Sequence, residues 1–350
     1  MSHPPARPTR LLPGLTLTKW LLLAGVVAGL AGSASALFLF ALDWATRTRE
    51  ATPWLIAFLP LVGAAVGWVY QHHGRGVDAG NNLLIDQIHD PQQTVPLRMA
   101  PLVLVSTVLS HLFGASVGRE GTAVQMGGAL ADQISHAFKF GPDDRRVVLM
   151  AGIAAGFASV FGTPLAGAVF ALEVLVRGRL RLDALLPCVV AAIVADQVGL
   201  LWSVHHTHYA VGAVPPLTVV ALLAVGVAGV AFGLTGKLFV QASHALSAAF
   251  KRWVPQPPLR PFIGGVVVAL AVCALGSQRY IGLGIPVIQQ AFTEPLAPWD
   301  WAAKLAFTVA SLGAGFKGGE VTPLFFIGAT LGNALAPLLQ LPFALLAGVG

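Results

Sequence analysis

Long apolar runs separated by short polar breaks dominate this chain. A bilayer is crossed by about 20 helical residues, and several of the runs reach or approach that length. Two further apolar segments, at 81–89 and 286–292, are too short to cross. We therefore predict an all-α protein that passes through a membrane many times, with broken and tilted helices. The predicted runs are 20–42, 54–70, 99–113, 123–138, 147–161, 165–176, 185–201, 217–250, 262–275, 301–312 and 324–339.

Two of the polar breaks share one pattern. The first reads Gly-Ala-Ser-Val-Gly-Arg-Glu-Gly-Thr over 114–122, and the second reads Gly-Ala-Gly-Phe-Lys-Gly-Gly-Glu-Val-Thr-Pro over 313–323. Each begins with Gly-Ala, contains a basic residue and glycines, and reaches a glutamate that is followed two residues later by threonine. Each then opens a new apolar run. This similarity indicates an internal repeat.

The chemistry of such a break favours anion binding. Glycines free the backbone from the helical ladder, and a helix that begins inside the membrane leaves its first N–H groups unpaired. Those N–H groups and the positive end of the helix dipole attract anions. A charged acidic residue in lipid costs about 2.5–3.5 kcal/mol, so Glu120 and Glu320 indicate function.

Two such breaks about 200 residues apart are typical of a transporter built from two repeats, with its site at the middle of the membrane. We predict a polar N-terminal tail at 1–18, a first transmembrane repeat at 19–203 and a second at 204–350. The last apolar segment opens after Pro342 and stops at Gly350. We therefore expect the sequence to be a fragment that lacks its C-terminal helices.

Composition agrees with a membrane protein. Hydrophobic residues make up 56% of the chain and charged residues 10%, against about 25% charged in soluble domains, and the mean hydropathy is +0.76. The net charge of +6 comes from short basic clusters between apolar runs. Such clusters are typical of solvated anchors beside a bilayer, so we expect the lipid bilayer as a partner and no nucleic acid.

Three motifs carry a family resemblance. Gly-Arg-Glu-Gly-Thr at 118–122 resembles the Gly-Arg/Lys-Glu-Gly-Pro signature of the CLC chloride channels and transporters. Phe-Gly-Thr-Pro-Leu-Ala-Gly at 161–167 resembles that family's Phe-Asn-Ala-Pro-Leu-Ala-Gly helix, and 319–323 stands where the family has Gly-x-Phe-x-Pro. Their order and spacing match. The resemblance implies a CLC-type fold of two inverted-topology repeats, a homodimer whose subunits each carry a pore, a cytoplasmic N-terminus and a place in the inner (plasma) membrane.

Departures from the family's signatures narrow the resemblance. Ala79 stands where chloride-transporting members place a serine hydroxyl, Asn81-Asn82 replaces Ile-Pro, and Thr122 replaces the proline after the glutamate. The inner glutamate of many chloride/proton exchangers is here Val174, while a glutamate appears at Glu320. This combination resembles the fluoride/proton antiporter branch, which commonly has methionine at the position of Ala79. The alternative is a chloride/proton antiporter or a voltage-gated-type chloride channel of the same family.

The resemblance also implies residue roles. Glu120 is the expected gating and proton-carrying glutamate, and Glu320 the expected second proton station. For each glutamate a structural role stays open: Glu120 in a salt bridge with Arg119, Glu320 in hydrogen bonds to neighbouring backbone. Fluoride and protons are the expected substrates, with chloride as the alternative anion. The expected anion-binding residues are Ala79, Gly80, Asn81, Asn82, Gly118, Arg119, Gly121, Thr122, Val321 and Thr322.

Other classes of protein fit less well. The chain could instead be a membrane enzyme or a non-transporting scaffold. An enzyme would need a nucleophile, a metal cluster or an acid/base pair near one face of the bilayer, and the sequence offers none beyond the two glutamates. The histidines at 72–73 and 205–208 lack a cysteine or carboxylate partner at useful spacing,. We therefore expect no enzyme activity, no cofactor and no metal. The glycine pairs at 127–128 and 264–265 are expected only to pack helices closely.

Overall fold

The computed structural model describes residues 13–91, 93–173, 182–212 and 214–350. Val174 and most of the predicted N-terminal tail lie outside these residues. The described residues form α-helices, two short 3-10 helices and one isolated backbone bridge. The α-helices are α1 (Pro13–Ala51), α2 (Leu59–His73), α3 (Asn81–His89), α4 (Met99–Leu112), α5 (Glu120–Ala137), α6 (Pro142–Phe161), α7 (Pro164–Glu173), α8 (Leu185–Leu201), α9 (Val219–Trp253), α10 (Leu259–Leu275), α11 (Ile285–Ala291), α12 (Asp300–Ala314), α13 (Val321–Leu339) and α14 (Phe343–Val349); the 3-10 helices are η1 (Pro53–Phe58) and η2 (Leu182–Ala184).

Five helical stretches in the described part are long and apolar enough to cross a membrane, which confirms the prediction of a multi-pass membrane protein. They are Leu17–Ala51, Pro53–His73, Leu182–Leu201, Val219–Trp253 and Val321–Leu339. The 39 residues of α1 and the 35 of α9 are the longest. At a rise of about 1.5 Å per residue both exceed the roughly 30 Å hydrocarbon core, so both must tilt or extend beyond it.

The two halves of the chain repeat one order of helices. A long helix is followed by a medium, a short and a medium helix, then by a polar break and another medium helix. In the first half these are α1 to α5, with 39, 15, 9, 14 and 18 residues. In the second half they are α9 to α13, with 35, 17, 7, 15 and 19 residues. The predicted repeat boundary at 203–204 lies in the connection between α8 and α9.

Small residues bring helices together closely. A Cβ placed on Gly152 of α6 would lie 2.5 Å from the carbonyl oxygen of Gly127 on α5, and one on Gly156 would overlap Ala123. A Cβ on Gly264 of α10 would likewise overlap Ala314 of α12. These contacts confirm that the glycine pairs are packing surfaces. The packing of α5 on α6 fixes where α5 begins, and therefore where its first N–H groups point.

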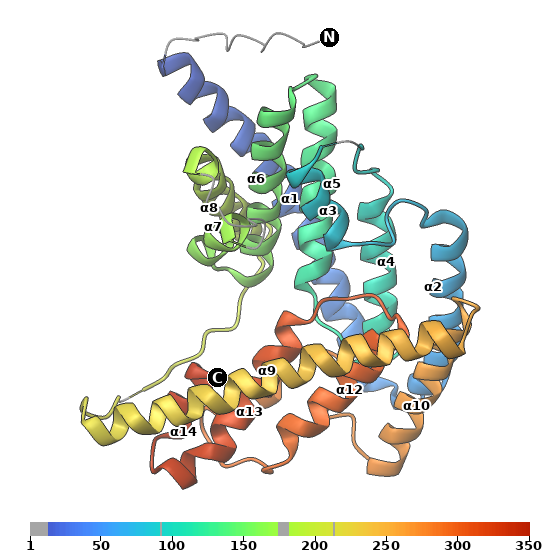
Figure 1. Cartoon of the computed structure of the whole chain (residues 1–350), viewed down its shortest axis with the longest axis vertical. Coiled ribbons are helices and arrows are strands. Elements are labelled where there is room, and N and C mark those ends of the chain that lie inside the picture. Colours follow the sequence, from blue (N-terminus) through green and yellow to red (C-terminus); the bar gives the residue numbers. More distant parts are fainter. Residues whose placement is uncertain (1–12, 92, 174–181, 213) are drawn as a thin grey trace.

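The two halves of the chain contact each other through two pairs of helices. Helix α2 of the first half packs against α10 of the second, and the N-terminal tip of α5 meets that of α13. In Figure 1 the green helices α5 to α8 stand together, while α9 crosses the second half, whose helices run from yellow to red. The meeting of the two helix tips brings both polar breaks to one place.

Candidate functional site

The two polar breaks pair directly through their backbones. The Gly118 N–H donates to the Gly319 carbonyl at 2.6 Å, and the Gly319 N–H donates to the Gly118 carbonyl at 2.9 Å, which makes an antiparallel bridge. Both breaks leave the preceding helix through a glycine with positive φ, Gly114 at +92° and Gly315 at +103°. Glycine adopts this region without the penalty of a side chain. The two polar breaks therefore face each other directly, one from each half of the chain.

The carboxylate of Glu120 lies in a cradle formed by both helix tips. Its Oε1 accepts from the Val321 N–H at 2.5 Å, and its Oε2 accepts from the Thr322 hydroxyl at 3.1 Å and the Thr322 N–H at 3.3 Å. The Arg119 N–H also donates to Oε2, at 2.9 Å. The residue is only 3% exposed. Hydrogen bonds to a charged group are about twice as strong as neutral ones. These four bonds therefore offset part of the free-energy cost of removing the carboxylate from water.

Glycine is required on both sides of this carboxylate. A Cβ on Gly118 would lie 2.7 Å from Oε2 of Glu120, and one on Gly319 would overlap Oε1. The cradle thus fits one carboxylate, or an anion of similar or smaller size, with nothing larger than hydrogen on either glycine. The two glycines that pair the repeats also make room for the bound group.

Buried hydroxyl groups fix the walls of the cradle. Thr122 Oγ1 lies 2.7 Å from Thr107 Oγ1 on α4. Across the repeats, Ser116 Oγ lies 2.9 Å from Thr308 Oγ1, and the Ser116 N–H donates to Ser311 Oγ at 3.0 Å. All five side chains are buried. Because buried polar groups must be paired, these bonds hold both breaks in one conformation.

The predicted anion-binding residues divide into two groups. Gly118, Arg119, Val321 and Thr322 surround the Glu120 carboxylate as described above, with Gly121 and Thr122 in the first turn of α5. Asn81 is beside this group, because a Cβ on Gly121 would lie 3.5 Å from Asn81 Nδ2 and 3.4 Å from Gly319 Cα.

The second group lies at the start of α3. Gly80 precedes α3 with φ of +60°, and a Cβ on this glycine would lie 3.3 Å from the amide nitrogen of Gln125. Ala79, Asn81 and Asn82 are exposed, and no hydrogen bond joins any of them to Glu120 among the described residues. A role for Ala79 and Asn82 therefore stays a prediction.

The structure can be compared with the purely structural roles left open for the two glutamates, a salt bridge to Arg119 for Glu120 and hydrogen bonds to neighbouring backbone for Glu320. Glu120 bonds to the backbone N–H of Arg119, and no salt bridge joins the two side chains among the described residues. Glu320 precedes α13 as its N-cap residue, is exposed, and makes no capping hydrogen bond. Its place beside Val321 puts it next to the cradle, and its role as a proton station stays a prediction.

Sequence reasoning missed one buried charge near the site. Lys304 of α12 is fully buried and donates to the carbonyls of Tyr280 at 3.1 Å and Gly282 at 2.6 Å. The signal was available, because a lysine inside the apolar run 301–312 is costly in a membrane and is expected to have a specific partner. Lys304 fixes the loop before α11.

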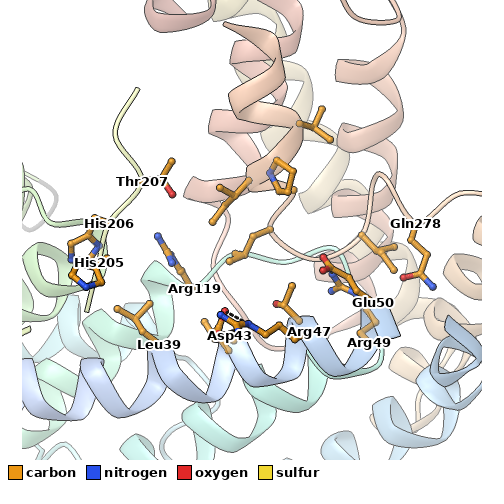
Figure 2. A pocket seen from close by; sticks show the side chains of 18 of the residues that line it. Leu39, Asp43, Arg47, Arg49, Glu50, Arg119, His205, His206, Thr207 and Gln278 are labelled. Carbon is orange, nitrogen blue, oxygen red and sulfur yellow. Dashed lines mark hydrogen bonds and ion pairs between the residues drawn. The ribbon is translucent and has the colours of Figure 1, made fainter. Parts of the chain in front are cut away.

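A cavity of about 890 Å³ opens beside Arg119. Its walls come from the last turns of α1, the connection after α8 and the loop before α11, and Figure 2 shows Arg119 among them. Glu120 is not one of its lining residues. The cavity therefore reaches the residue that precedes Glu120 in the chain, and not Glu120 itself.

Comparison with known proteins agrees with this geometry. The family model described as "Voltage gated chloride channel" matches residues 62–350. The chain belongs to the voltage-gated chloride channel (CLC) family. Its relative from Pseudomonas syringae pv. tomato, a "Chloride/fluoride channel protein", is 66% identical over 340 residues, which cover 95% of this chain and 75% of the relative.

Solved structures of two antiporters show the same fold. The crystal structure of a CLC-type fluoride/proton antiporter superposes with a TM-score of 0.91 at 38% identity, covering 95% of this chain and 85% of that one. A slow cyanobacterial Cl⁻/H⁺ antiporter superposes with a TM-score of 0.75 at 21% identity, covering 92% and 80%; at this identity it shows the fold alone. The predicted CLC-type all-α fold is confirmed.

Proposed function

We propose that this protein is a secondary transporter that exports fluoride in exchange for protons. The observation that carries the proposal is the cradle in which four donors from two helix tips hold the Glu120 carboxylate. A site that binds a carboxylate oxygen with N–H and O–H groups suits a small anion equally well. The similar proteins named as a chloride/fluoride channel protein and a fluoride/proton antiporter support fluoride as that anion.

One side chain then couples the two substrates. When charged, Glu120 occupies the cradle and competes with fluoride for its donors. When protonated, it loses its charge-assisted bonds and leaves, carrying its proton while fluoride takes its place. Glu320, exposed at the start of α13, is our candidate for the proton's second station. Exchange is obligatory because the cradle holds only one of the two anions at a time.

The donors around the cradle suit a strongly hydrated anion. Fluoride must exchange its water for close hydrogen-bond donors, yet bind weakly enough to be released. Thr322 supplies a hydroxyl and an N–H, and the Asn81 amide lies beside Gly121. Ala79 supplies no hydroxyl. We assign anion contacts to the Asn pair and to the residues of the two helix tips.

The assembly and location follow from the same proposal. All donors to Glu120 come from one chain, so each subunit of a homodimer would carry a complete cradle of its own. We place this dimer in the inner (plasma) membrane. There, export of fluoride in exchange for entering protons would lower the fluoride concentration inside the cell. Chemical cross-linking of the purified protein in lipid tests the dimer.

The test of the function is a flux measurement in proteoliposomes. Vesicles loaded with potassium fluoride and given valinomycin are placed in fluoride-free buffer, and fluoride and protons are followed with two electrodes. We expect fluoride efflux to drive protons inward against a proton gradient, with little coupled movement when chloride replaces fluoride. Coupled chloride transport at a similar rate would favour a chloride/proton antiporter, and anion flow without proton movement would favour a channel.

A further inference from the structure

Helix α9 carries a histidine, His244, inside its long apolar sequence. The helix ends in Lys251, Arg252 and Trp253. Basic and aromatic residues of this kind are typical of the membrane surface, so α9 reaches a membrane face at this end. His244 precedes Lys251 by two helical turns, about 10 Å. Ionisable residues at such a depth are rare in membrane helices, and chains of acidic residues and histidines there are typical of proton relays.

The part of α9 around His244 packs against the second polar break. Leu246, two residues after the histidine, and Leu324 of α13 pack against the same apolar cluster. A Cβ on Gly313, the first residue of the break, would lie 2.9 Å from the side chain of Leu246. Leu324 follows Glu320 by one helical turn. The packing therefore brings this part of α9 to the start of α13, where Glu320 is located.

The carboxyl group of Glu320 is within electrostatic range of two other titratable groups. The charge of Glu120 acts on it from the cradle, and the charge of His244 acts on it from α9. The side chains of Glu320 and His244 are both exposed. Ionisable residues at membrane depth generally pair with one another or face water. Glu320 thus has one titratable neighbour in the cradle and another on α9.

Other charged groups near this part of α9 already have contacts of their own. Helices α12, α13 and α14 pack against α9, and of these α12 carries the charged residues, Asp300 and Lys304. Asp300 pairs with an arginine before α11, and Lys304 donates to two backbone carbonyls. Lys317, within the break, lies against an aromatic ring of α2. Among the described residues of these elements, Glu320 is therefore the acidic group available to His244.

A buried hydroxyl group at this interface needs a partner. Ser243, next to His244, has its Oγ buried without a hydrogen bond to any described residue. Buried polar groups are nearly always paired, and an internal water molecule is the usual partner where no protein group serves. Water beside Ser243 would also connect Glu320 to His244, which no direct hydrogen bond joins in the described structure.

We propose that His244 relays protons between Glu320 and the membrane face at which α9 ends. The proposal rests on the proposed function, in which Glu320 is the second proton station. The Glu320 carboxyl group gives its proton through water to the neutral imidazole of His244, which leaves a carboxylate and an imidazolium. The imidazolium then releases a proton to water at the end of α9 and becomes neutral again. The same steps run backwards when protons move the other way. Imidazole suits this task because it changes charge near neutral pH and can accept a proton on one nitrogen while it donates from the other.

The rate of coupled exchange in proteoliposomes tests the relay. His244→Ala removes the titrating group and should slow fluoride-driven proton uptake about tenfold or more, because positioned proton-transfer groups contribute about a hundredfold or more to reaction rates. The number of protons exchanged per fluoride should stay the same, since Glu120 and its cradle are untouched. Gln241→Ala, which truncates an exposed polar residue three positions earlier on α9, is the matched control and should exchange at the wild-type rate.

Two comparisons separate a relay from a purely structural role. In Glu120→Gln, fluoride is expected to leave without protons, so the addition of His244→Ala should not change that fluoride rate, whereas damage to the fold would lower it. His244→Glu restores a titratable group and should recover most of the coupled rate. The pH dependence of that rate should shift to lower pH, because carboxyl groups titrate below imidazole. If His244→Ala does not fold, His244→Gln takes its place, since it keeps the polarity without the titration.

Two results would overturn the relay. One is a wild-type rate of coupled exchange in His244→Ala or His244→Gln, and the other is an equal fall of the fluoride rate with and without the Glu120→Gln change. The proposed function fails separately. If the wild-type protein exchanges chloride but not fluoride for protons, fluoride is excluded as the substrate, and the same His244 comparisons test the relay with chloride. A wild-type protein that moves no protons would exclude both proposals.

Discussion

Replacement of Glu120 by glutamine removes the charge from the cradle with little change of shape. The carboxylate accepts one hydrogen bond on Oε1 and three on Oε2, but an amide has only one acceptor oxygen. With that oxygen in the place of Oε2, the Val321 N–H faces an NH₂ group and loses its acceptor. The opposite orientation leaves three donors unpaired and is worse.

The size of the effect follows from these four bonds. Three bonds that lose their charge assistance weaken by about 1 kcal/mol each, and one buried N–H left unpaired costs about 1–3 kcal/mol. The glutamine is therefore held in the cradle more weakly than the carboxylate by about 4 kcal/mol or more. At 1.4 kcal/mol per factor of ten, the cradle opens to anions about a thousandfold more readily. The amide also carries no exchangeable acidic proton.

The flux assay in proteoliposomes reads out both consequences. Glu120→Gln should let fluoride leave loaded vesicles while the proton electrode shows no uptake beyond that of protein-free vesicles. Glu294→Gln, which changes an exposed glutamate outside the site, is the control and should pump protons as the wild type does. Proton uptake at the wild-type ratio in Glu120→Gln would refute the exchange of carboxylate and anion in one cradle.

Three further substitutions have expected outcomes. Gly319→Ala puts a methyl group where Oε1 of Glu120 lies, so fluoride flux should fall to background while size-exclusion chromatography still shows folded protein. Thr322→Val removes the hydroxyl that donates to Oε2 at 3.1 Å; if that hydroxyl also donates to fluoride, the KM for fluoride should rise about tenfold or more, whereas an unchanged KM would exclude this contact. Asp132→Asn weakens the buried ion pair with Arg145, whose Nε and Nη2 lie 2.6 and 3.0 Å from the carboxylate. Because loss of such a pair costs about 3–5 kcal/mol, the detergent-solubilised protein should unfold at a clearly lower temperature. An unchanged melting curve would contradict this.

The sequence was sufficient to predict that the two helix tips meet, and that they meet around Glu120. The order glycine, basic residue, glutamate and threonine recurs in both breaks, and lipid penalises an acidic residue so strongly that Glu120 had few purely structural explanations. The family motifs then supplied the fold. The contact of Thr322 with Glu120 confirms that the breaks meet.

The sequence was insufficient where the answer depends on which residues pair across the fold. Arg49 and Arg279 look like loop anchors in the sequence, yet the first joins α4 to the loop before α11 and the second pairs with Asp300. The partner of Lys304 is a pair of backbone carbonyls, which no side-chain pattern reveals. The Nε of Arg119, which is buried and has no hydrogen-bond partner among the described residues, could likewise be recognised only in the folded structure.

The backbone bridge between Gly118 and Gly319 constrains how this protein moves. Many transporters expose their substrate alternately by rocking one half of the molecule against the other. Here each half donates one main-chain hydrogen bond to the other beside the Glu120 cradle, so separating the halves would break both bonds and leave four peptide groups unsatisfied in a dry environment. We therefore expect the backbone around the cradle to stay fixed. The part that moves is then the Glu120 side chain alone, by rotation about its χ angles.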